Sequence, residues 1–425
     1  MTHEDIIMAN RKPNIVFIHA DQLNANAISA YGNKFVKTPN IDFLVRGGVS
    51  FSASYSTNPV CCPARTSWYT GLMSSEHGVV WNDIAPRKDL VDIGTHLSGN
   101  GYDCYYTGKW HIPPIRVTGG FQQLYKGTGM GEYTDAAVAD VAEAFFNSRE
   151  GDKPFFYNAG FLNPHDICFW TFGQNPAKYE YAAIVEDELP PLPESYDPNE
   201  PTCLGSERNL RYYIYSYYRM VEMVDREVGR IVQAVLNSKY ADNTLIIFSA
   251  DHGEMKVAHN RFTKGVLDED SARVPLVFYM PGSAQKDVVD RLHMVNGVDV
   301  TATILDYAGA GLLPEMKFGQ SLRPIVEGKQ CTFREYTVSE TYRPAMQTMI
   351  RKGDMKSLHS KDGVILYDLA ADPNEMKDIA ADQKYAAVVS EHKALYEKYR
   401  KTIIPMKEPE GGWDSLEKAS SKKKK

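Results

Sequence analysis

A cysteine and an arginine stand four residues apart in the run Cys61-Cys62-Pro63-Ala64-Arg65, and together they could attack and hold an anion. Proline two residues after Cys61 suits the first turn of a helix. A cysteine there would lie beside unpaired N–H groups that favour an anion, and Arg65, one turn further on, supplies a fixed positive charge. From this segment alone, however, a buried structural cysteine beside a helix start is the better interpretation.

Continuous apolar runs predict the strands that would position such groups. They lie at residues 14–20 (NIVFIHA), 102–107, 154–161, 244–249 and 274–280, and they have the pattern of strands buried on both faces. Helical patterns lie between them, at about 208–237 and 298–309. Strands that alternate with helices predict an α/β fold with a large, mostly parallel central sheet flanked by helices.

Polar or ionisable residues follow four of these runs. They are Asp21 with Gln22, Lys109 with His111, His165, and Asp251 with His252. Because ligands of such sheets gather at the carboxyl ends of the strands, we expect these side chains to meet in one site. Taken singly, each has a plainer interpretation, since a lysine or histidine at a strand end is usually a solvated loop residue and Asp251 could cap a turn.

A series of ordered segments resembles the motifs of the type I sulfatase family, and residues 61–71 meet every fixed position of its signature C-x-P-S/A-R-x-x-x-x-T-G. The others are a Gly-Tyr pair at 101–102 with GKWH at 108–111, DHGE at 251–254, RVPL at 273–276, and LYDL with DPNE within 366–375. His259 and Lys264 also stand at the family's spacing after the DHG turn. The resemblance runs from about residue 14 to 375, and it implies an alkaline-phosphatase-like fold.

The resemblance implies a modification that residue types alone would not reveal. In sulfatases the signature cysteine is oxidised after synthesis to formylglycine (3-oxoalanine), so Cys61 would be converted by a maturation enzyme. The hydrate of this group is a geminal diol, whose second hydroxyl can expel the sulfate after its transfer. An unconverted preparation is therefore expected to be nearly inactive.

The resemblance also implies a divalent cation, held by Asp21, Asp251, His252 and the modified Cys61. Gln22 stands where many members of the family have a second aspartate, and it would be a neutral ligand or lie just outside the ligands. Calcium is the expected ion, although the imidazole of His252 leaves manganese or another transition metal open.

Six side chains would act on the sulfate or its ester. The cation and Arg65 would lower the nucleophile's pKa and neutralise sulfate charge, and Lys109 and Lys264 resemble the family's clamps on the sulfate oxygens. His111 would deprotonate the second hydroxyl for sulfate release, and His165, with Lys264, would protonate the leaving oxygen. His259 would contact the sulfate or the group that bears it.

The expected reaction is hydrolysis of a sulfate ester, with a sulfated carbohydrate as the working substrate by analogy with bacterial sulfatases. A phosphonate monoester or phosphodiester hydrolase of the same superfamily is the alternative, because the tetrahedral anions are alike in size. An inactive protein that binds sulfated glycans is the alternative outside enzymes. It predicts the loss of at least one core group, and none is lost.

The chain is expected to form two parts. Residues 1–325 would be the catalytic α/β domain, and the proline-rich insert at 166–206 would be a surface loop or lid whose aromatic residues stack on a sugar or form its own small core. Residues 326–425 would be a smaller C-terminal α+β subdomain with a small antiparallel sheet, a helix near 384–401 and a basic tail at 420–425.

Composition excludes several classes of protein. A net charge of −7 argues against a nucleic-acid surface, and six scattered cysteines are too few for a disulfide framework. Residues 1–12 are polar and lack the apolar core of a signal peptide, and eighteen apolar residues nowhere run together, so no membrane span is expected. The expected location is the cytoplasm, or the periplasm or the exterior if a signal peptide was removed.

Overall fold

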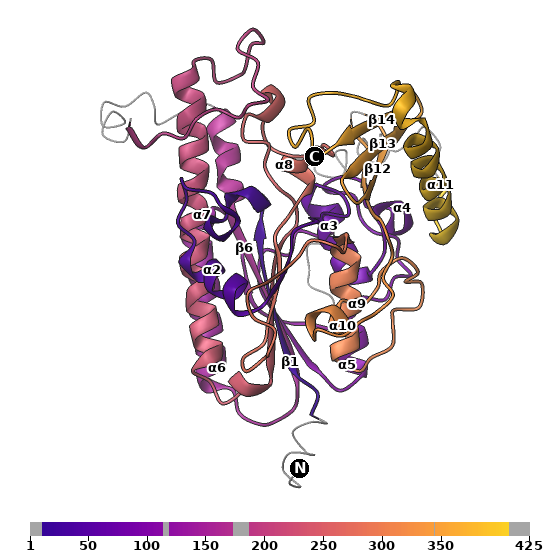
Figure 1. The fold of residues 1–425 in the computed structure, drawn as a ribbon. Coiled ribbons are helices and arrows are strands. Elements are labelled where there is room, and N and C mark those ends of the chain that lie inside the picture. The colour runs from indigo at the N-terminus through magenta and orange to yellow at the C-terminus, as the bar shows by residue number, and fades with distance from the viewer. Residues whose placement is uncertain (1–10, 114–118, 173–186, 344, 408–425) are drawn as a thin grey trace, which may run out of the picture.

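An eight-stranded sheet forms the centre of the computed structural model, which describes residues 11–113, 119–172, 187–343 and 345–407 (Figure 1). In spatial order its strands are β5 (Gln122–Lys126), β4 (Asp103–Gly108), β6 (Phe155–Pro164), β1 (Asn14–Asp21), β7 (Thr244–Ala250), β8 (Leu276–Tyr279), β2 (Val49–Phe51) and β9 (Val288–Asp290). The strands from β5 to β7 are parallel, whereas β8 runs antiparallel to both β7 and β2. The predicted mostly parallel sheet is confirmed.

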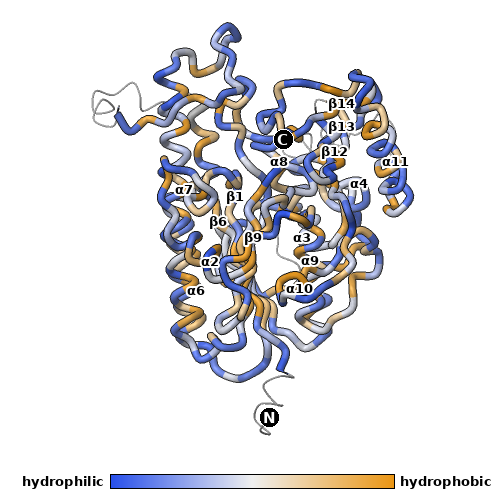
Figure 2. The backbone as a smooth tube through the Cα atoms, in the orientation of Figure 1, coloured by the Kyte–Doolittle hydropathy of each residue, from blue (hydrophilic) through white to orange (hydrophobic). Residues whose placement is uncertain are grey.

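Helices cover both faces of this sheet because its strands are apolar on both sides. In β1, Val16 and Ile18 pack into a core shared with α6 and α7, whereas Ile15 and Phe17 pack into a second core shared with α3 and α9. The larger helices are α2 (Pro39–Gly47), α3 (Cys61–Thr70), α5 (Ile93–Gly99), α6 (Gly131–Ser148), α7 (Glu207–Leu236) and α9 (Gly297–Tyr307). Figure 2 shows much of the apolar chain in the central strands between these two layers.

The remaining strands and α-helices in the part of the chain that contains the central sheet are short. They are β3 (Ser54–Tyr55), β10 (Val295–Asn296), α4 (Ser74–His77), α8 (Glu269–Ala272) and α10 (Arg323–Val326). Part of the predicted insert, residues 173–186, lies outside the described residues. Two of the insert's aromatic residues, Tyr179 and Tyr181, fall in this part, so their predicted stacking on a sugar or packing in a small core lies outside the described residues.

A smaller α+β unit follows at the C-terminal side. Its antiparallel sheet has the order β11 (Thr337–Thr341), β12 (Gln347–Lys352), β13 (Met355–Ser360) and β14 (Gly363–Asp368), and α11 (Ala386–Thr402) packs on β12 and β13. The expected small antiparallel sheet with a helix is confirmed. The domain boundary at 325–326 stays a prediction, and the basic tail at 420–425 lies outside the described residues.

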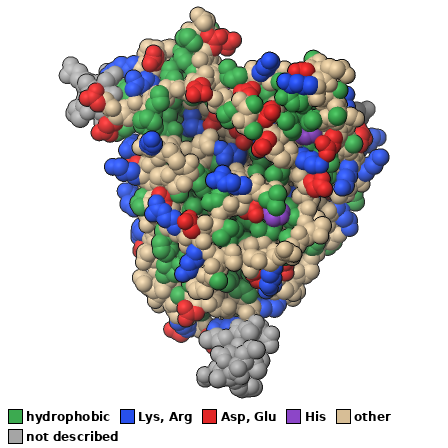
Figure 3. All heavy atoms as spheres, viewed as in Figure 1, with side chains coloured by type: hydrophobic (Ala, Val, Ile, Leu, Met, Phe, Trp, Pro, Cys, Tyr) green, Lys and Arg blue, Asp and Glu red, His purple; other side chains and the backbone are tan. Residues whose placement is uncertain are grey.

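Charged side chains of both signs are interspersed on the face of the molecule that Figure 3 draws. With a net charge of −7, this mixture differs from the basic excess that a nucleic-acid surface needs. Among the described residues, the helices lack the combination of length and apolar character that a bilayer crossing requires.

Glu340 of β11 joins the two parts of the chain, and its loss is expected to destabilise both. Its buried carboxylate accepts hydrogen bonds from the Ser75 N–H and hydroxyl, each at 2.9 Å, and from the Tyr399 hydroxyl at 2.8 Å. Glu340→Ala would leave three buried donors without this acceptor, so we expect the free energy of unfolding to fall by about 2–4 kcal/mol. Denaturant titration measures this fall. Glu335→Ala at a solvent-exposed carboxylate is the control, and similar midpoints for the two variants would contradict the prediction.

Candidate active site

Four side chains from three elements meet at the carboxyl edge of the central sheet. Asp21 ends β1, Asp251 and His252 follow β7, and Cys61 begins α3. One ligand atom of each of the four lies within 4.8 Å of the others, and all four residues are fully buried. The prediction that the strand ends converge is therefore confirmed for these residues, and Cys61 lies at the helix start that Pro63 indicated.

Arg65 holds the two carboxylates of this cluster together. Its Nε donates to Asp251 Oδ2 at 2.8 Å and its Nη2 to Asp21 Oδ2 at 3.0 Å. Its Nη1 donates to the carbonyl of Lys109 at 2.8 Å, and the whole side chain is inaccessible to solvent. Every nitrogen of the guanidinium is thus engaged by the protein, so Arg65 fixes the positions of the carboxylates.

Two lysines add positive charge around Cys61. Lys109 Nζ lies 2.5 Å from Asp21 Oδ2, and the charge of Lys264 acts on the Cys61 thiol. Burial alone would raise the pKa of the Cys61 thiol, but Lys264, Lys109 and His252 outweigh it and lower this pKa well below its ordinary value. Burial opposes the ionisation of Asp21 as well, yet the surrounding cations keep the pKa of its carboxyl below the usual range. The site therefore stabilises negative charge at Cys61.

The orientation of His252 fits a bound cation. Its Nδ1 lies 2.9 Å from the carbonyl of Gly253, which fixes the proton on Nδ1 and leaves Nε2 facing the cluster. Nε2 is 3.1 Å from Cys61 Sγ and 3.8 Å from Asp21 Oδ1. Burial lowers the pKa of His252, but Asp251 and Cys61 outweigh burial and raise it. The groups around Nε2 thus favour a positive charge at this position, as the ligands of a bound cation would.

Gln22 lies beside the cluster, and its side chain contacts Lys264, Glu254 and Cys168. Its Oε1 accepts a hydrogen bond from Lys264 Nζ, and its Nε2 donates to the carboxylate of Glu254. Its backbone N–H donates to Asp251 Oδ1 at 3.0 Å, and its carbonyl accepts from the Tyr217 hydroxyl at 2.7 Å. In this arrangement the oxygen of Gln22 faces Lys264.

The two predicted proton-transfer histidines are linked to Cys61 through their ionisation. His111 adds to the groups that lower the pKa of the Cys61 thiol, and Cys61 acts to raise the pKa of His165 against the effect of burial. Nδ1 of His111 is buried and has no hydrogen-bond partner among the described residues. Burial, reinforced by Lys264 and Lys109, lowers the pKa of His165 to about 4.

His259, predicted to contact the sulfate, has polar contacts elsewhere. Its backbone N–H donates to Ser195 Oγ at 3.2 Å, and its Nε2 lies 3.8 Å from Asp268 Oδ1. Its φ of 51° places it in a strained turn beside the end of the insert. None of these contacts joins it to Cys61, and its contact with the sulfate or the group that bears it stays a prediction.

Two residues that position the site, His19 and Glu254, had no role predicted from the sequence. His19 Nε2 donates to Asn158 Oδ1 at 2.9 Å, which leaves Nδ1 to accept from Arg65 Nη1 at 3.5 Å. Glu254 is fully buried and accepts from the Tyr213 hydroxyl at 2.8 Å and from Gln22. The sequence did contain a signal for His19. Residues two apart in a strand point to the same face of the sheet, and His19 precedes Asp21 by two positions.

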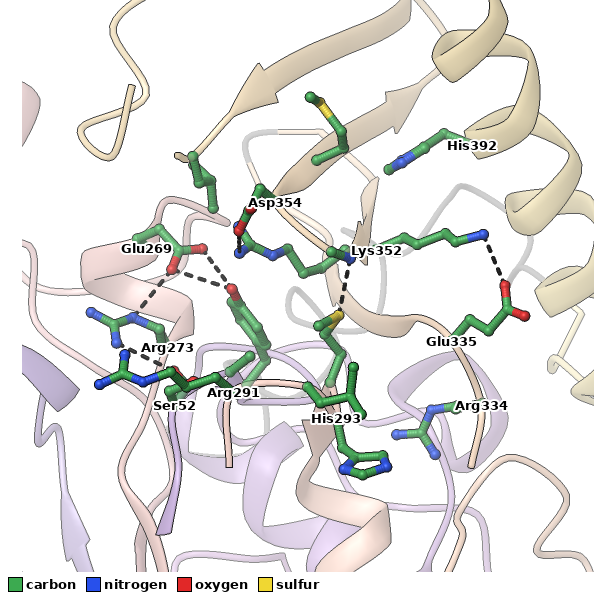
Figure 4. Close-up of a pocket in the computed structure, with 18 of the residues that line it drawn as sticks. Ser52, Glu269, Arg273, Arg291, His293, Arg334, Glu335, Lys352, Asp354 and His392 are labelled. Carbon is green, nitrogen blue, oxygen red and sulfur yellow. Dashed lines mark hydrogen bonds and ion pairs between the residues drawn. The ribbon is translucent and has the colours of Figure 1, made fainter. Parts of the chain in front are cut away.

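A cleft of about 1180 Å³ lies elsewhere, between α8 and the C-terminal elements β12, β13 and α11 (Figure 4). Six of the charged residues that line it form ion pairs, namely Glu269 with Arg273 at 3.2 Å, Lys352 with Glu335 at 2.8 Å, and Arg351 with Asp354 at 3.6 Å. The predicted site residues are not among those that line it. Size alone therefore does not identify the active site, whereas the buried charges around Cys61 do.

Comparison with known proteins agrees with this site. The family model described as Sulfatase matches residues 13–310, more than half of the chain. The chain belongs to the sulfatase family. A second model, described as N-sulphoglucosamine sulphohydrolase, C-terminal, matches residues 257–402 of this sulfatase and so covers its C-terminal sheet.

Individual relatives extend the similarity over nearly the whole length of this sulfatase. It is 30% identical over 433 residues to the Delta 4,5-hexuronate-2-O-sulfatase of Bacteroides thetaiotaomicron, which covers 92% of this chain and 89% of the relative. The solved structure of a 2-O GAG sulfatase matches with a TM-score of 0.80 at 26% identity, over 92% of each chain. The phosphonate monoester hydrolase of Agrobacterium radiobacter shares the fold, with a TM-score of 0.77 at 23% identity over 94% of this chain and 99% of that one.

Proposed function

We propose that this sulfatase hydrolyses a sulfate ester of a carbohydrate, with Cys61 as the precursor of a formylglycine nucleophile. One observation carries the proposal: three potential ligands, Asp21, Asp251 and His252, meet Cys61 in a fully buried cluster with Arg65 and Lys109 beside it. A sulfate ester leaves a sulfate anion in the site, and buried cationic groups stabilise such charge more strongly than solvated ones do.

Asp21, Asp251 and His252 would hold the divalent cation, with the converted Cys61 as a further ligand. We propose calcium, because two carboxylates are hard oxygen donors, with manganese as the alternative that His252 permits. The cation would supply Lewis-acid stabilisation of negative charge. The formylglycine hydrate, made by a formylglycine-generating maturation enzyme, would supply the nucleophilic hydroxyl and a second hydroxyl for sulfate release.

The other side chains divide between holding charge and moving protons. Arg65 keeps both carboxylates in place, since all of its nitrogens are already engaged. Lys109 and Lys264 hold the sulfate oxygens, with Gln22 and Glu254 fixing the ammonium of Lys264. His111 and His165 keep their proposed proton-transfer roles, because the pKa of the Cys61 thiol responds to His111 and that of His165 responds to Cys61.

Two relatives support a carbohydrate as the group that bears the sulfate. One is named as a hexuronate-2-O-sulfatase and the other as a 2-O GAG sulfatase, and both align with about nine-tenths of this chain. The phosphonate monoester hydrolase shares the fold at lower identity, so the competing reaction is tested directly.

Protein produced together with a formylglycine-generating enzyme tests the proposal. We expect mass spectrometry of the peptide containing Cys61 to show the aldehyde in place of the thiol, in proportion to activity. We also expect kcat/KM to be higher for an aryl sulfate than for the matched aryl phosphonate. An intact thiol with full activity would refute the mechanism, and a clear preference for the phosphonate would replace the sulfatase assignment.

A further inference from the structure

Residues 127–131, which lead into α6, lie against the ends of β4 and β6. A Cβ added at Gly127 would stand 2.8 Å from the backbone nitrogen of Lys109, which follows β4. A Cβ added at Gly131 would stand 2.6 Å from the side chain of Asn163, near the end of β6. The segment therefore connects two strand ends whose side chains are proposed to act on the sulfate.

Asp166 lies where this segment meets the end of β6. Pro164, the last residue of β6, pairs with the proposed cation ligand Asp21 in β1, and Asp166 follows two residues later. Its Oδ2 accepts hydrogen bonds from the N–H of Gly131 at 2.7 Å and from that of Glu132 at 3.4 Å. One oxygen of the carboxylate thus holds the start of α6 beside the site.

The other oxygen of Asp166 has no donor. Asp166 is buried, with 4% of the residue exposed, and its Oδ1 accepts no hydrogen bond from the described residues. The side-chain oxygen of Asn163 is likewise buried and without a donor in the part of the chain that the structure describes. Both side chains adjoin Gly131. Because buried acceptors are nearly always paired, two orphaned ones at one place indicate a site for a molecule that brings hydrogen-bond donors.

The charges nearby indicate which donor fits. Burial raises the pKa of the Asp166 carboxyl, whereas the two N–H groups that it binds and the charge of Lys109 act to lower it. Two acceptor oxygens repel a second anion, and the charge of Lys109 disfavours an ammonium group. A neutral hydroxyl, which donates without adding charge, is the best match.

We propose that Asp166 and Asn163 bind a hydroxyl group of the sugar, on the ring carbon next to the one that carries the sulfate. The inference rests on the proposed function and adds to it two residues that choose among sugars. His165, assigned to the leaving oxygen, directly precedes Asp166, so we place the bound hydroxyl next to that oxygen. A site built to bind a hydroxyl rejects an analogue that lacks it, because the buried acceptors are then left unpaired.

Two pairs of sugars test this, each pair differing in one hydroxyl and having equal charge. The first pair is methyl glucoside 2-sulfate and its 3-deoxy analogue, and the second is methyl galactoside 4-sulfate and its 3-deoxy analogue. In both sulfates the 3-hydroxyl is the only hydroxyl on a carbon next to the sulfated one. Each sugar is measured as an inhibitor of aryl sulfate hydrolysis by the converted, cation-loaded enzyme, which reports affinity whether or not the sugar is cleaved.

We expect the hydroxylated member of at least one pair to inhibit about tenfold more strongly than its deoxy partner. Asp166→Asn is expected to reduce this preference to about threefold or less, because it keeps an oxygen for Gly131 but replaces the free acceptor with an N–H group. Asp135→Asn is the matched control. Asp135 is a buried carboxylate at the same strand, but both of its oxygens are engaged, by the N–H of Leu162 at 2.7 Å and that of Asn163 at 2.9 Å. It should leave the preference unchanged.

Equal inhibition by both members of both pairs, or a preference that Asp166→Asn leaves intact, would overturn the inference, as would an equal loss of preference in Asp135→Asn. The preference is a ratio measured on one variant, so a smaller folded fraction does not change it. Failure of the proposed function gives a different result, namely no hydrolysis of aryl sulfates by the converted enzyme. In that case calorimetric titration of the same four sugars still decides whether Asp166 binds the hydroxyl.

Discussion

Cys61→Ala is expected to lower kcat/KM for aryl sulfates by about 10⁴-fold or more, measured on cation-loaded protein produced with the maturation enzyme. The substitution removes the atom from which the nucleophile is made, while Arg65 and the two lysines remain. The two lysines would still bind the sulfate, so we expect KM to change much less than kcat. A loss confined to KM would contradict the role of Cys61 as the nucleophile precursor.

The adjacent Cys62 provides a matched control in the same turn of α3. Both cysteines are fully buried, yet burial raises the pKa of the Cys62 thiol to about 12, whereas the cations around Cys61 lower that of its neighbour. Cys62→Ala should therefore lose packing alone and keep activity within about tenfold of wild type. Similar losses for the two variants, with similar falls in Tm, would indicate that packing of α3 explains both.

The sequence predicted the location of the site because one physical rule governs it. β4, β6, β1 and β7 are neighbours in the sheet and parallel, so the residues that follow them meet at one edge. Lys109, His165, Asp21 and Asp251 are those residues. The cysteine adds to this edge because α3 begins there, as the proline in its first turn indicated.

The partners of these side chains could not be predicted in the same way. Arg65 was expected to face the sulfate, but its three nitrogens are all directed at Asp21, Asp251 and a backbone carbonyl. Gln22 and Lys264 are far apart in the chain, and their hydrogen bond depends on how the turn after β7 folds back over β1. Motif spacing places a residue near a site, whereas the direction of a long side chain depends on neighbours from other segments.

The fold shows a similar division. Long apolar strands and the amphipathic α7 were predicted nearly to the residue, because their patterns are strong. α6 was not predicted, since alanines make up half of the buried stripe formed by Val138, Ala139, Ala142 and Phe146. The three-residue strands β2 and β9 are too short to show a period, and the reversed direction of β8 leaves no trace in composition.

Removal of the cation by a chelator is expected to abolish hydrolysis and to lower Tm, and calcium is expected to restore both. The carboxylates of Asp21 and Asp251 are buried together, and the like charge of Asp21 adds to burial in raising the pKa of Asp251. A cation relieves this repulsion in the folded state alone. Binding at a thousandfold excess over Kd would therefore add about 4 kcal/mol to the free energy of unfolding.

Asp251→Asn separates this effect from general stabilisation by salts, because it removes one ligand charge but retains the shape of the side chain. We expect it to reduce the rise of Tm with calcium severalfold, measured by calorimetry after chelation and readdition. Asp225→Asn, at a buried carboxylate of α7 that accepts the Ile41 N–H at 2.7 Å, should keep the full rise. If neither the Tm nor the activity changes when the chelator is added, the cation site is disproved. A larger rise of Tm with manganese than with calcium would indicate that the nitrogen ligand His252, rather than the carboxylates, determines which ion is preferred.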